Sequence, residues 1–295
     1  MSLAPIGIVT YSRIDHLTQT VDSLKSNDLA KESELYIFLD APRMGDEDKV
    51  RIVRDYIHTI DGFKNVHIIE REKNDLYANY KLGIKQMLDE HGRCIFLEDD
   101  NVVSSAFLNY MNDGLDFYNE NKKIMAISGY NVPTIFPNSY KHDYYLSTYF
   151  NAWGFATWAD RGFLDIVSYN DQYNEMMANK DLFKKIKKIH PNLINGLKLI
   201  QEGKLDAGDY KMVFHLIKND LLTIKPIKSL VNNIGHDGSG VHCGVNDRFQ
   251  NVELNSTKIK FSNNVEYTKF IDEIYYKYVI KKSNIFKRII NKVFK

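Results

Sequence analysis

The chain has 295 residues, of which 44% are hydrophobic and 26% are charged, as is usual for a globular protein. This length suits one large α/β domain or two small ones. The net charge of +1 provides no overall field that would attract nucleic acid, so we expect no nucleic-acid partner.

Cysteine content and apolar runs indicate the compartment. Cys94 and Cys243 are the two cysteines, too few for a disulfide framework and consistent with a reducing environment. The N-terminal residues lack the basic and apolar regions of a signal peptide. No apolar run approaches the ~18 residues that span a bilayer. We therefore expect a cytoplasmic protein.

The first 130 residues alternate between strand and helix patterns. Short apolar runs predict strands at 5–11, 35–39, 66–69, 94–97 and 124–128. Apolar residues at helical spacing predict helices from residue 15 and at 46–60, 76–90 and 104–119. This alternation predicts an α/β fold with a doubly wound, mostly parallel sheet and right-handed crossovers.

The second half of the sequence has a different pattern of residue types. An aromatic stretch at 144–150 precedes a mixture of small and aromatic residues at 151–158, which makes poor regular structure. A helical region at 171–219 and a glycine-rich segment at 232–244 follow. Because no repeat or low-complexity linker interrupts the chain, we predict one domain over 1–260 with a divergent second half from residue 131. A helical basic tail is predicted at 261–295.

An acid triplet follows the apolar strand at 94–97. Glu98, Asp99 and Asp100 would be costly to bury together unless a cation lies among them. Mg²⁺ and Mn²⁺ prefer oxygen ligands and share them with substrate phosphates. The carboxyl ends of parallel strands are also where open α/β sheets bind ligands. The triplet predicts a divalent cation with a polyphosphate; the alternative is an acidic turn that caps the next helix.

Polar residues end two other predicted strands. Thr10, Tyr11 and Arg13 follow the first strand, where they can hold a nucleotide base or phosphate. Asp40 ends the second strand, where its carboxylate can accept from a uracil N–H or a ribose hydroxyl. Such residues are common at strand ends, but these converge with the acid triplet at one edge of the sheet.

Two segments of the second half add candidates. The mixture at 151–158 includes Trp153 and Gly154, and aromatic faces of this kind can form the floor of a sugar pocket. The alternative is an aromatic cluster in the core. Asp209 opens a predicted helix, so it is either an ordinary first-turn acid or a functional carboxylate.

Segments in one order resemble a known family. They are PIGIVTYSR, the strand ending at Asp40, DLYANYKLGIKQML, IFLEDDN, AWGFATW, GDYK and NNIGHDGSGVH. Over residues 4–245 the chain resembles the GT-A-fold glycosyltransferases related to N-acetylglucosaminyltransferase I, especially bacterial members of polysaccharide gene clusters. The acid triplet is the most specific element of this resemblance.

The resemblance implies roles for individual residues. Asp100 would ligate Mn²⁺ or Mg²⁺, Asp99 would face the ribose and Glu98 would approach the donor sugar. Asp209, followed by an aromatic residue, would be the catalytic base. Where the family has a nucleotide-contacting histidine, this chain has Tyr77. The implied donor-binding residues are Thr10, Tyr11, Arg13, Asp40, Tyr77, Asn79, Lys81, Glu98, Asp99, Trp153 and Gly154.

The implied reaction is metal-dependent transfer of a sugar, with inversion, from a nucleotide-sugar to a hydroxyl of a glycan. UDP is favoured as the nucleotide by the resemblance alone. Residues 1–130 would form the nucleotide-binding half and residues 131–260 the acceptor and catalytic half. The acceptor would be a glycan or a lipid-linked glycan in bacterial surface-polysaccharide assembly.

Three glycines make 232–242 a candidate for a mobile loop that closes over a diphosphate. His242 is the candidate metal ligand in it, and His236 is a second candidate for metal or phosphate. The alternative is that both histidines face solvent.

The last 15 residues combine six basic side chains with an apolar stripe. A basic amphipathic helix of this kind can lie on an anionic bilayer, which would make the protein peripheral to the inner face of the membrane. The alternative is a helix that docks on the body or on a second subunit. The stripe consists of Ile285, Phe286, Ile289, Ile290, Val293 and Phe294.

Two rival functions follow from the same residues. A sugar-nucleotide pyrophosphorylase shares a doubly wound sheet, but it needs a glycine-rich phosphate loop that the segment 7–13 lacks. A catalytically inactive glycan-binding module would keep the fold without needing the acid triplet or Asp209.

Overall fold

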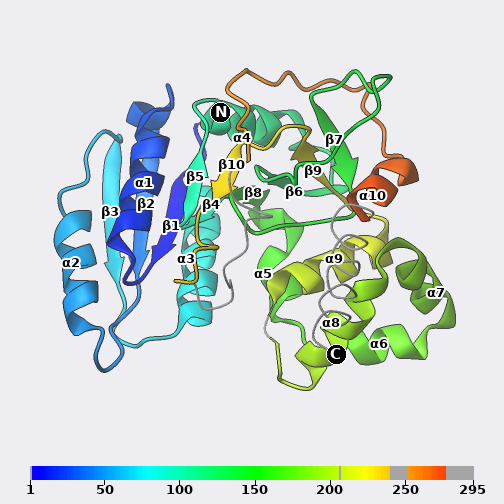
Figure 1. Ribbon diagram of the computed structural model, residues 1–295, viewed down its shortest axis with the longest axis horizontal. Coiled ribbons are helices and arrows are strands. Elements are labelled where there is room, and N and C mark those ends of the chain that lie inside the picture. The colour runs from blue at the N-terminus through cyan, green and yellow to red at the C-terminus, as the bar shows by residue number, and fades with distance from the viewer. Residues whose placement is uncertain (1, 206, 240–251, 277–295) are drawn as a thin grey trace, which may run out of the picture.

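The computed structural model describes residues 2–205, 207–239 and 252–276 (Figure 1). Within them, eight strands form one mixed sheet in the order β3-β2-β1-β4-β8-β6-β9-β7. Its strands are β1 (Ile6–Thr10), β2 (Glu34–Leu39), β3 (Asn65–Glu70), β4 (Arg93–Glu98), β6 (Ile124–Ser128), β7 (Tyr144–Ser147), β8 (Phe155–Trp158) and β9 (Leu222–Pro226). The predicted α/β class is confirmed.

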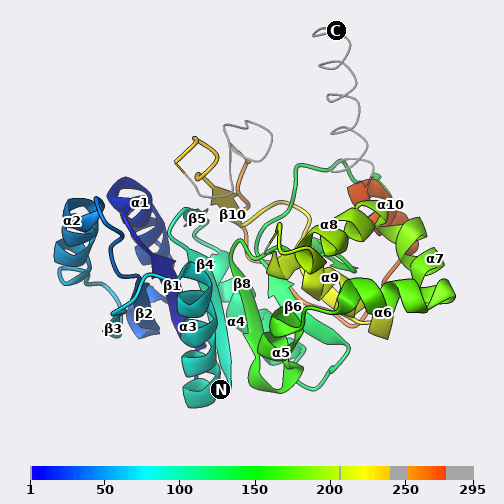
Figure 2. The ribbon, with the colours of Figure 1, turned by 90° about the horizontal axis from the view of Figure 1, so that it is seen from below.

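Helices cover both faces of the sheet. The face formed with α1, α2 and α4 has one apolar core, and the face formed with α3 and α5 to α9 has another. Figure 2 shows α1 and α3 on opposite sides of the first strands. The helices are α1 (Ile14–Lys25), α2 (Glu47–Ile57), α3 (Leu76–His91), α4 (Phe107–Phe117), α5 (Phe163–Ser168), α6 (Gln172–Ala178), α7 (Lys180–Ile189), α8 (Pro191–Gln201), α9 (Gly208–Asn219) and α10 (Lys269–Tyr276).

Successive side chains of β1 point to opposite faces of the sheet, so the strand contributes to both cores. Ile6 and Ile8 point to the core with α1, whereas Val9 points to the core with α3. Gly7 lies between them on the α3 side, where an added Cβ would come within 2.5 Å of Met87 Cε. A glycine here therefore lets α3 pack directly against the strand.

The first four strands pair in parallel and end at one edge. β1 lies between β2 and β4, with Val9 opposite Glu98 in the register. At the end of β1, the Thr10 carbonyl accepts a hydrogen bond of 3.1 Å from the backbone N–H of Asp40. The predicted convergence of Thr10, Asp40 and the acid triplet at one edge is thus confirmed.

The segment 151–158 departs from the prediction of poor regular structure. Its second half forms β8, which runs antiparallel between β4 and β6 in the middle of the sheet. All four residues of β8 are buried, which is why the strand consists of small and aromatic side chains. Gly154, with a φ of +64°, turns the chain into the strand.

A two-stranded ribbon of β5 (Asn101–Val103) and β10 (Val231–Asn233) corrects the predicted loop. Asn232 and Asn233 belong to a strand, with Asn233 opposite Asn101. The ribbon is too short and its partners too distant in sequence for periodicity to reveal it. Its consequence is that the glycine-rich segment begins beside the acid triplet.

Helix α10 is held against the sheet by a buried carboxylate. Asp272 accepts from Ser147 Oγ at 2.7 Å, Thr148 Oγ1 at 2.6 Å and Tyr267 Oη at 2.9 Å. The basic side chains and apolar stripe at the end of the chain lie outside the described residues. Among the helices of the described segments, none has the length and apolar character needed to cross a bilayer.

Candidate functional site

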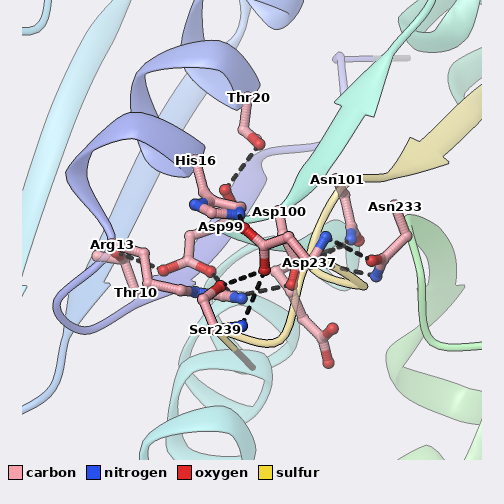
Figure 3. A network of polar contacts seen from close by, with 12 residues as sticks. Thr10, Arg13, His16, Thr20, Asp99, Asp100, Asn101, Asn233, Asp237 and Ser239 are labelled. Carbon is pink, nitrogen blue, oxygen red and sulfur yellow. Dashed lines mark hydrogen bonds and ion pairs between the residues drawn. The ribbon is translucent and has the colours of Figure 1, made fainter. Parts of the chain in front are cut away.

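Asp99 is the centre of a polar network at the end of β4 (Figure 3). Its Oδ2 accepts from Thr10 Oγ1 at 3.0 Å, and its backbone carbonyl accepts from Thr20 Oγ1 at 2.8 Å. Arg13 donates to its Oδ1. Burial raises the pKa of Asp99, while Arg13 opposes that rise. Thr10 and Arg13 thus hold the Asp99 side chain, and Thr20 on α1 holds its backbone.

Arg13 joins the two aspartates. Its Nη2 donates both to Asp99 and, at 2.8 Å, to Asp100 Oδ2. Burial lowers the pKa of Arg13, but the two carboxylates outweigh it, so the pKa lies above the usual value. The guanidinium therefore provides the counter-charge that two buried carboxylates need.

Asp100 is held from its other side by two amides. Its Oδ1 accepts from Asn101 Nδ2 at 2.7 Å and from Asn233 Nδ2 at 3.1 Å (Figure 3). Its backbone carbonyl accepts from the Ile234 N–H at 2.9 Å. A Cβ at Gly235 would lie 2.1 Å from Asp100 Oδ2. The start of the glycine-rich segment thus packs directly on the second aspartate.

The oxygen atoms of Asp99 and Asp100 fit a hard divalent cation. They are almost fully buried and already hold a positive guanidinium between them. An ion bound at Asp100 Oδ2 would take a place that Arg13 now contacts. No group of three or more His, Cys, Asp or Glu side chains able to hold a metal occurs within residues 2–205, 207–239 and 252–276.

Of the two candidate histidines in the glycine-rich segment, the structure describes His236. His236 is buried, and its ring meets that of Trp153 edge to face with centroids 5.3 Å apart. Burial lowers its pKa, and the nearby Asp100 carboxylate opposes that effect. His236 therefore does not face solvent. His242 lies outside the described residues.

Asp209 approaches the acid triplet from the second half of the chain. It lies in the first turn of α9, but no side chain caps this helix. Its carboxylate accepts instead from the backbone N–H of Ala152. Burial raises the pKa of Asp209 to about 6, while that hydrogen bond and the charge of Lys225 limit the rise.

Asp209 is close enough to Glu98 to affect the ionisation of Glu98. The pKa of Glu98 lies well above its usual value because of burial, and the charges of Asp100, Asp209 and Asp99 add to the effect. Burial raises the pKa of Tyr80, on α3, and the charges of Glu98 and Asp209 add to this effect. The fold therefore brings together two carboxyl groups that lie far apart in sequence.

Sequence reasoning missed Lys225 and Asn151. Lys225 is fully buried on β9, and its Nζ donates to Asn151 Oδ1 at 2.6 Å. The available signal was a lysine directly after Ile224 in a short β-branched run, where a buried strand normally has an apolar residue.

Tyr11 and Asp40 organise the loops beyond β1 and β2. Tyr11 Oη donates to Asp46 Oδ2 at 3.0 Å and accepts from the Arg43 N–H at 2.8 Å. Asp40 Oδ1 accepts from the backbone N–H of Asp75 at 3.1 Å, which fixes the residue that caps α3. Burial raises the pKa of Asp40.

Three candidates lie on the first turns of α3. Tyr77 and Lys81 are partly exposed there. Asn79 is buried: its Nδ2 donates to the Phe38 carbonyl at 3.0 Å, and its Oδ1 accepts from Arg71 Nε at 2.8 Å. Both ends of the Asn79 amide are therefore used to attach α3 to the sheet.

Trp153 and Gly154 lie beside β10. The Trp153 ring is partly exposed and meets Tyr130 edge to face, with centroids 4.7 Å apart. A Cβ at Gly154 would come within 2.8 Å of Val231 Cγ2. Phe155 and Trp158 are core residues, so the aromatic cluster that was the alternative interpretation accounts for these two.

Solved structures give low-identity matches. A mannosyltransferase, PcManGT from Pyrobaculum calidifontis in complex with GDP-Man and Mn²⁺, is 12% identical, with 73% of this chain and 70% of that chain covered and a TM-score of 0.41. GalNAc-T7 with UDP, GalNAc and Mn²⁺ is 13% identical, with 77% and 43% covered and a TM-score of 0.45. TarS of S. aureus is 14% identical, with 56% and 29% covered and a TM-score of 0.37, so the chain spans less than a third of that protein.

A search of curated protein sequences gives no match. The family described as Glycosyl transferase family 2 matches residues 6–200, which are more than half of the chain and include the acid triplet and β8. This agrees with the predicted GT-A architecture. The chain therefore belongs to Glycosyl transferase family 2.

Proposed function

We propose that the protein is a metal-dependent, inverting glycosyltransferase that moves a sugar from a nucleotide-sugar to a hydroxyl of a glycan. The observation that carries this proposal is the meeting of Glu98 and Asp209, from β4 and α9, next to the aspartate pair. One end of this site suits a diphosphate and its cation, and the other offers a carboxylate for proton transfer.

The donor would bind across the ends of the first strands. Asp99, fixed by Thr10 and Arg13, would face the ribose, and Tyr11 and Asp40 would border the nucleoside. Partly exposed Tyr77, Lys81 and Trp153 remain donor candidates. We omit Asn79 because its amide is fully engaged within the protein.

Mn²⁺ or Mg²⁺ would be held by Asp100, with His242 as a further candidate. When bound, such an ion supplies positive charge that stabilises the departing diphosphate. The protein's own contribution is to keep Asp100 oriented through Asn101 and Asn233.

Asp209 would act as the base. Its carboxylate accepts the proton of the acceptor hydroxyl as that oxygen forms a bond to the anomeric carbon. The bond from the anomeric carbon to the diphosphate oxygen breaks on the opposite face, so configuration inverts. Burial and the neighbouring carboxylates raise the pKa of Glu98, so this side chain is the more readily protonated partner and would approach the hydroxyls of the donor sugar.

The finer assignments are also proposals. The sequence resemblance supports UDP as the nucleotide and a relation to N-acetylglucosaminyltransferase I. It also supports a glycan or lipid-linked glycan as the acceptor, in surface-polysaccharide assembly. The same holds for the division into a nucleotide-binding half at 1–130 and an acceptor half at 131–260.

The donor site is tested by calorimetric titration with UDP, GDP and CMP, each with and without Mn²⁺. We expect one nucleotide to bind only with the ion, and Asp100→Asn to lose this binding. Asp55→Asn, an exposed change on α2, is the matched control. Binding that is equally tight without metal would contradict metal dependence; no binding of any nucleotide would contradict the donor site.

The base is tested with Asp209→Asn. We expect nucleotide binding to persist while turnover, measured as nucleotide release, falls by at least about 10³-fold. A binding module would have no turnover to lose, and a pyrophosphorylase would form nucleotide-sugar from a sugar phosphate. The anomeric configuration of the product, read by NMR, decides between inversion and retention.

A further inference from the structure

Lys225 is an unusual residue for the middle of a sheet. It lies on β9, between β6 and β7, with no exposed surface. Burying an ammonium group is unfavourable unless it is hydrogen-bonded and compensated by charge. Lys225 therefore needs a hydrogen-bond acceptor and a compensating negative charge close by.

The direct partner is a turn that contacts Asp209. Lys225 Nζ donates to Asn151 Oδ1 at 2.6 Å. The next residue along the chain, Ala152, donates its backbone N–H to the Asp209 carboxylate. Lys225, Asn151, Ala152 and Asp209 thus form one continuous connection from β9 to the first turn of α9.

The charges around Lys225 point to the same carboxylate. Burial lowers the pKa of Lys225 to about 7, and the charges of Asp209 and Asp272 oppose that effect. Asp272, on α10, already accepts hydrogen bonds from Ser147, Thr148 and Tyr267. Of the two acids, Asp209 therefore depends more on Lys225 for its charge balance.

The other groups that face Asp209 are acids or weak acids. Glu98 on β4 and Tyr80 on α3 interact with it, as does Tyr210 beside it. Since these groups do not stabilise an anion through their charge, Lys225 is the cation among the described residues that favours ionised Asp209.

We propose that Lys225 is a positioning residue, which holds the 151–152 turn against Asp209 and keeps that carboxylate in its proton-accepting form. This inference rests on the proposed role of Asp209 as the base. Lys225 acts through the turn and through its charge, and it takes no proton from the substrate itself.

The test is an NMR titration of protein with ¹³C-labelled aspartate carboxyls, in which Asp209→Asn identifies the Asp209 signal. In Lys225→Met we expect the midpoint of the Asp209 titration to move to higher pH by about one unit or more, because a nearby cation has been removed. Lys225→Gln, which keeps a donor for Asn151 but has no charge, is expected to give the same shift.

Lys211→Met is the matched control. Lys211 is also a buried lysine, donating to the Val167 carbonyl at 3.0 Å and to Asn170 Oδ1 at 2.7 Å, and it lies two residues from Asp209. We expect this change to lower Tm but to leave the Asp209 midpoint in place. An equal shift in Lys211→Met and Lys225→Met would overturn the proposal.

Kinetics provide a second readout. In Lys225→Met the acidic limb of kcat should move with the Asp209 midpoint, while calorimetric binding of UDP with Mn²⁺ stays within about twofold. If neither Lys225 variant folds, Asn151→Leu should lower kcat without changing nucleotide binding, and an unchanged kcat overturns the positioning role.

The proposed function and this inference fail in different ways. Full turnover in Asp209→Asn would remove the base and with it the role of Lys225. Lost turnover in Asp209→Asn together with an unmoved Asp209 midpoint in Lys225→Met would overturn the role of Lys225 alone.

Discussion

Arg13 is the residue whose position says most about how the donor site works. Its guanidinium contacts both Asp99 and Asp100, so without a metal the aspartate pair already has a cation. A divalent ion at Asp100, as proposed, would compete with this contact. Arg13 would then be available to a phosphate, a ligand that suits a guanidinium well.

Replacement of Arg13 by Gln tests this competition. We expect the metal-free variant to have a lower Tm than the native protein, because two buried carboxylates lose their counter-charge. Mn²⁺ should bind roughly tenfold more tightly and raise Tm by more than it does in the native protein. Thermal shift with increasing Mn²⁺ measures both, and Arg43→Gln, at a residue that bonds Asn74, is the control. Weaker Mn²⁺ binding in Arg13→Gln would contradict the competition.

Asp209 sets an expectation for pH. Burial raises its pKa to about 6, and a base must be ionised to accept a proton. Activity should therefore be full above this pH and fall about tenfold per pH unit below it. A profile of kcat/KM between pH 4 and 8 gives the midpoint, and a limb near the ordinary aspartate value would contradict the raised pKa.

At the scale of elements, the β5–β10 ribbon links the acid triplet to the glycine-rich segment. Asn233 bonds Asp100 from this ribbon, and His16 Nε2 lies 3.1 Å from Asp237 Oδ2 just beyond it (Figure 3). The segment is thus attached at its start to the turn after β4 and to α1. Close packing at Gly235 is part of this attachment.

Gly235→Ala should disturb the aspartate pair. A methyl group 2.1 Å from Asp100 Oδ2 cannot be accommodated by a carboxylate that Asn101 and Asn233 hold in place. We expect metal-dependent nucleotide binding to weaken at least about tenfold, the equivalent of roughly 1.4 kcal/mol. Gly203→Ala, where φ is +67° and nothing lies within 4 Å, should lower stability by about 1 kcal/mol and leave binding unchanged. Equal effects on binding would count against a role for Gly235.

The elements that sequence could predict are those with a strong local period. Strands β1 to β4 and β6 and helices α1 to α4 were predicted because apolar residues repeat at strand or helix spacing over enough residues to be recognised. β5, β8 and β10 were missed because they have three or four residues and depend on partners distant in sequence. The same limit applied within the site: the acid triplet was visible as a motif, whereas the Lys225–Asn151 contact exists only once β9 is placed.

At the scale of the whole molecule, the basic tail is predicted to bind an anionic membrane. If the basic amphipathic tail at 281–295 binds membranes, the full chain should sediment with anionic vesicles at low salt and be released at high salt. The combined change of Lys281, Lys282, Lys287 and Arg288 to Gln should abolish this, while nucleotide binding persists. No sedimentation of the native chain at low salt would leave docking on the body or a second subunit as the explanation.

The central position of β8 also determines how the chain can be divided. Residues 1–130 contain β4 and β6, but these strands do not touch each other; each pairs with β8, which arrives only with residues 155–158. A fragment that ended at residue 130 would leave one edge of β4 and both edges of β6 unpaired, and unpaired strand edges invite aggregation. The two proposed functional halves are therefore joined through the pairing of β8 with β4 and β6. When they are expressed separately they should be insoluble, and co-expression should restore solubility.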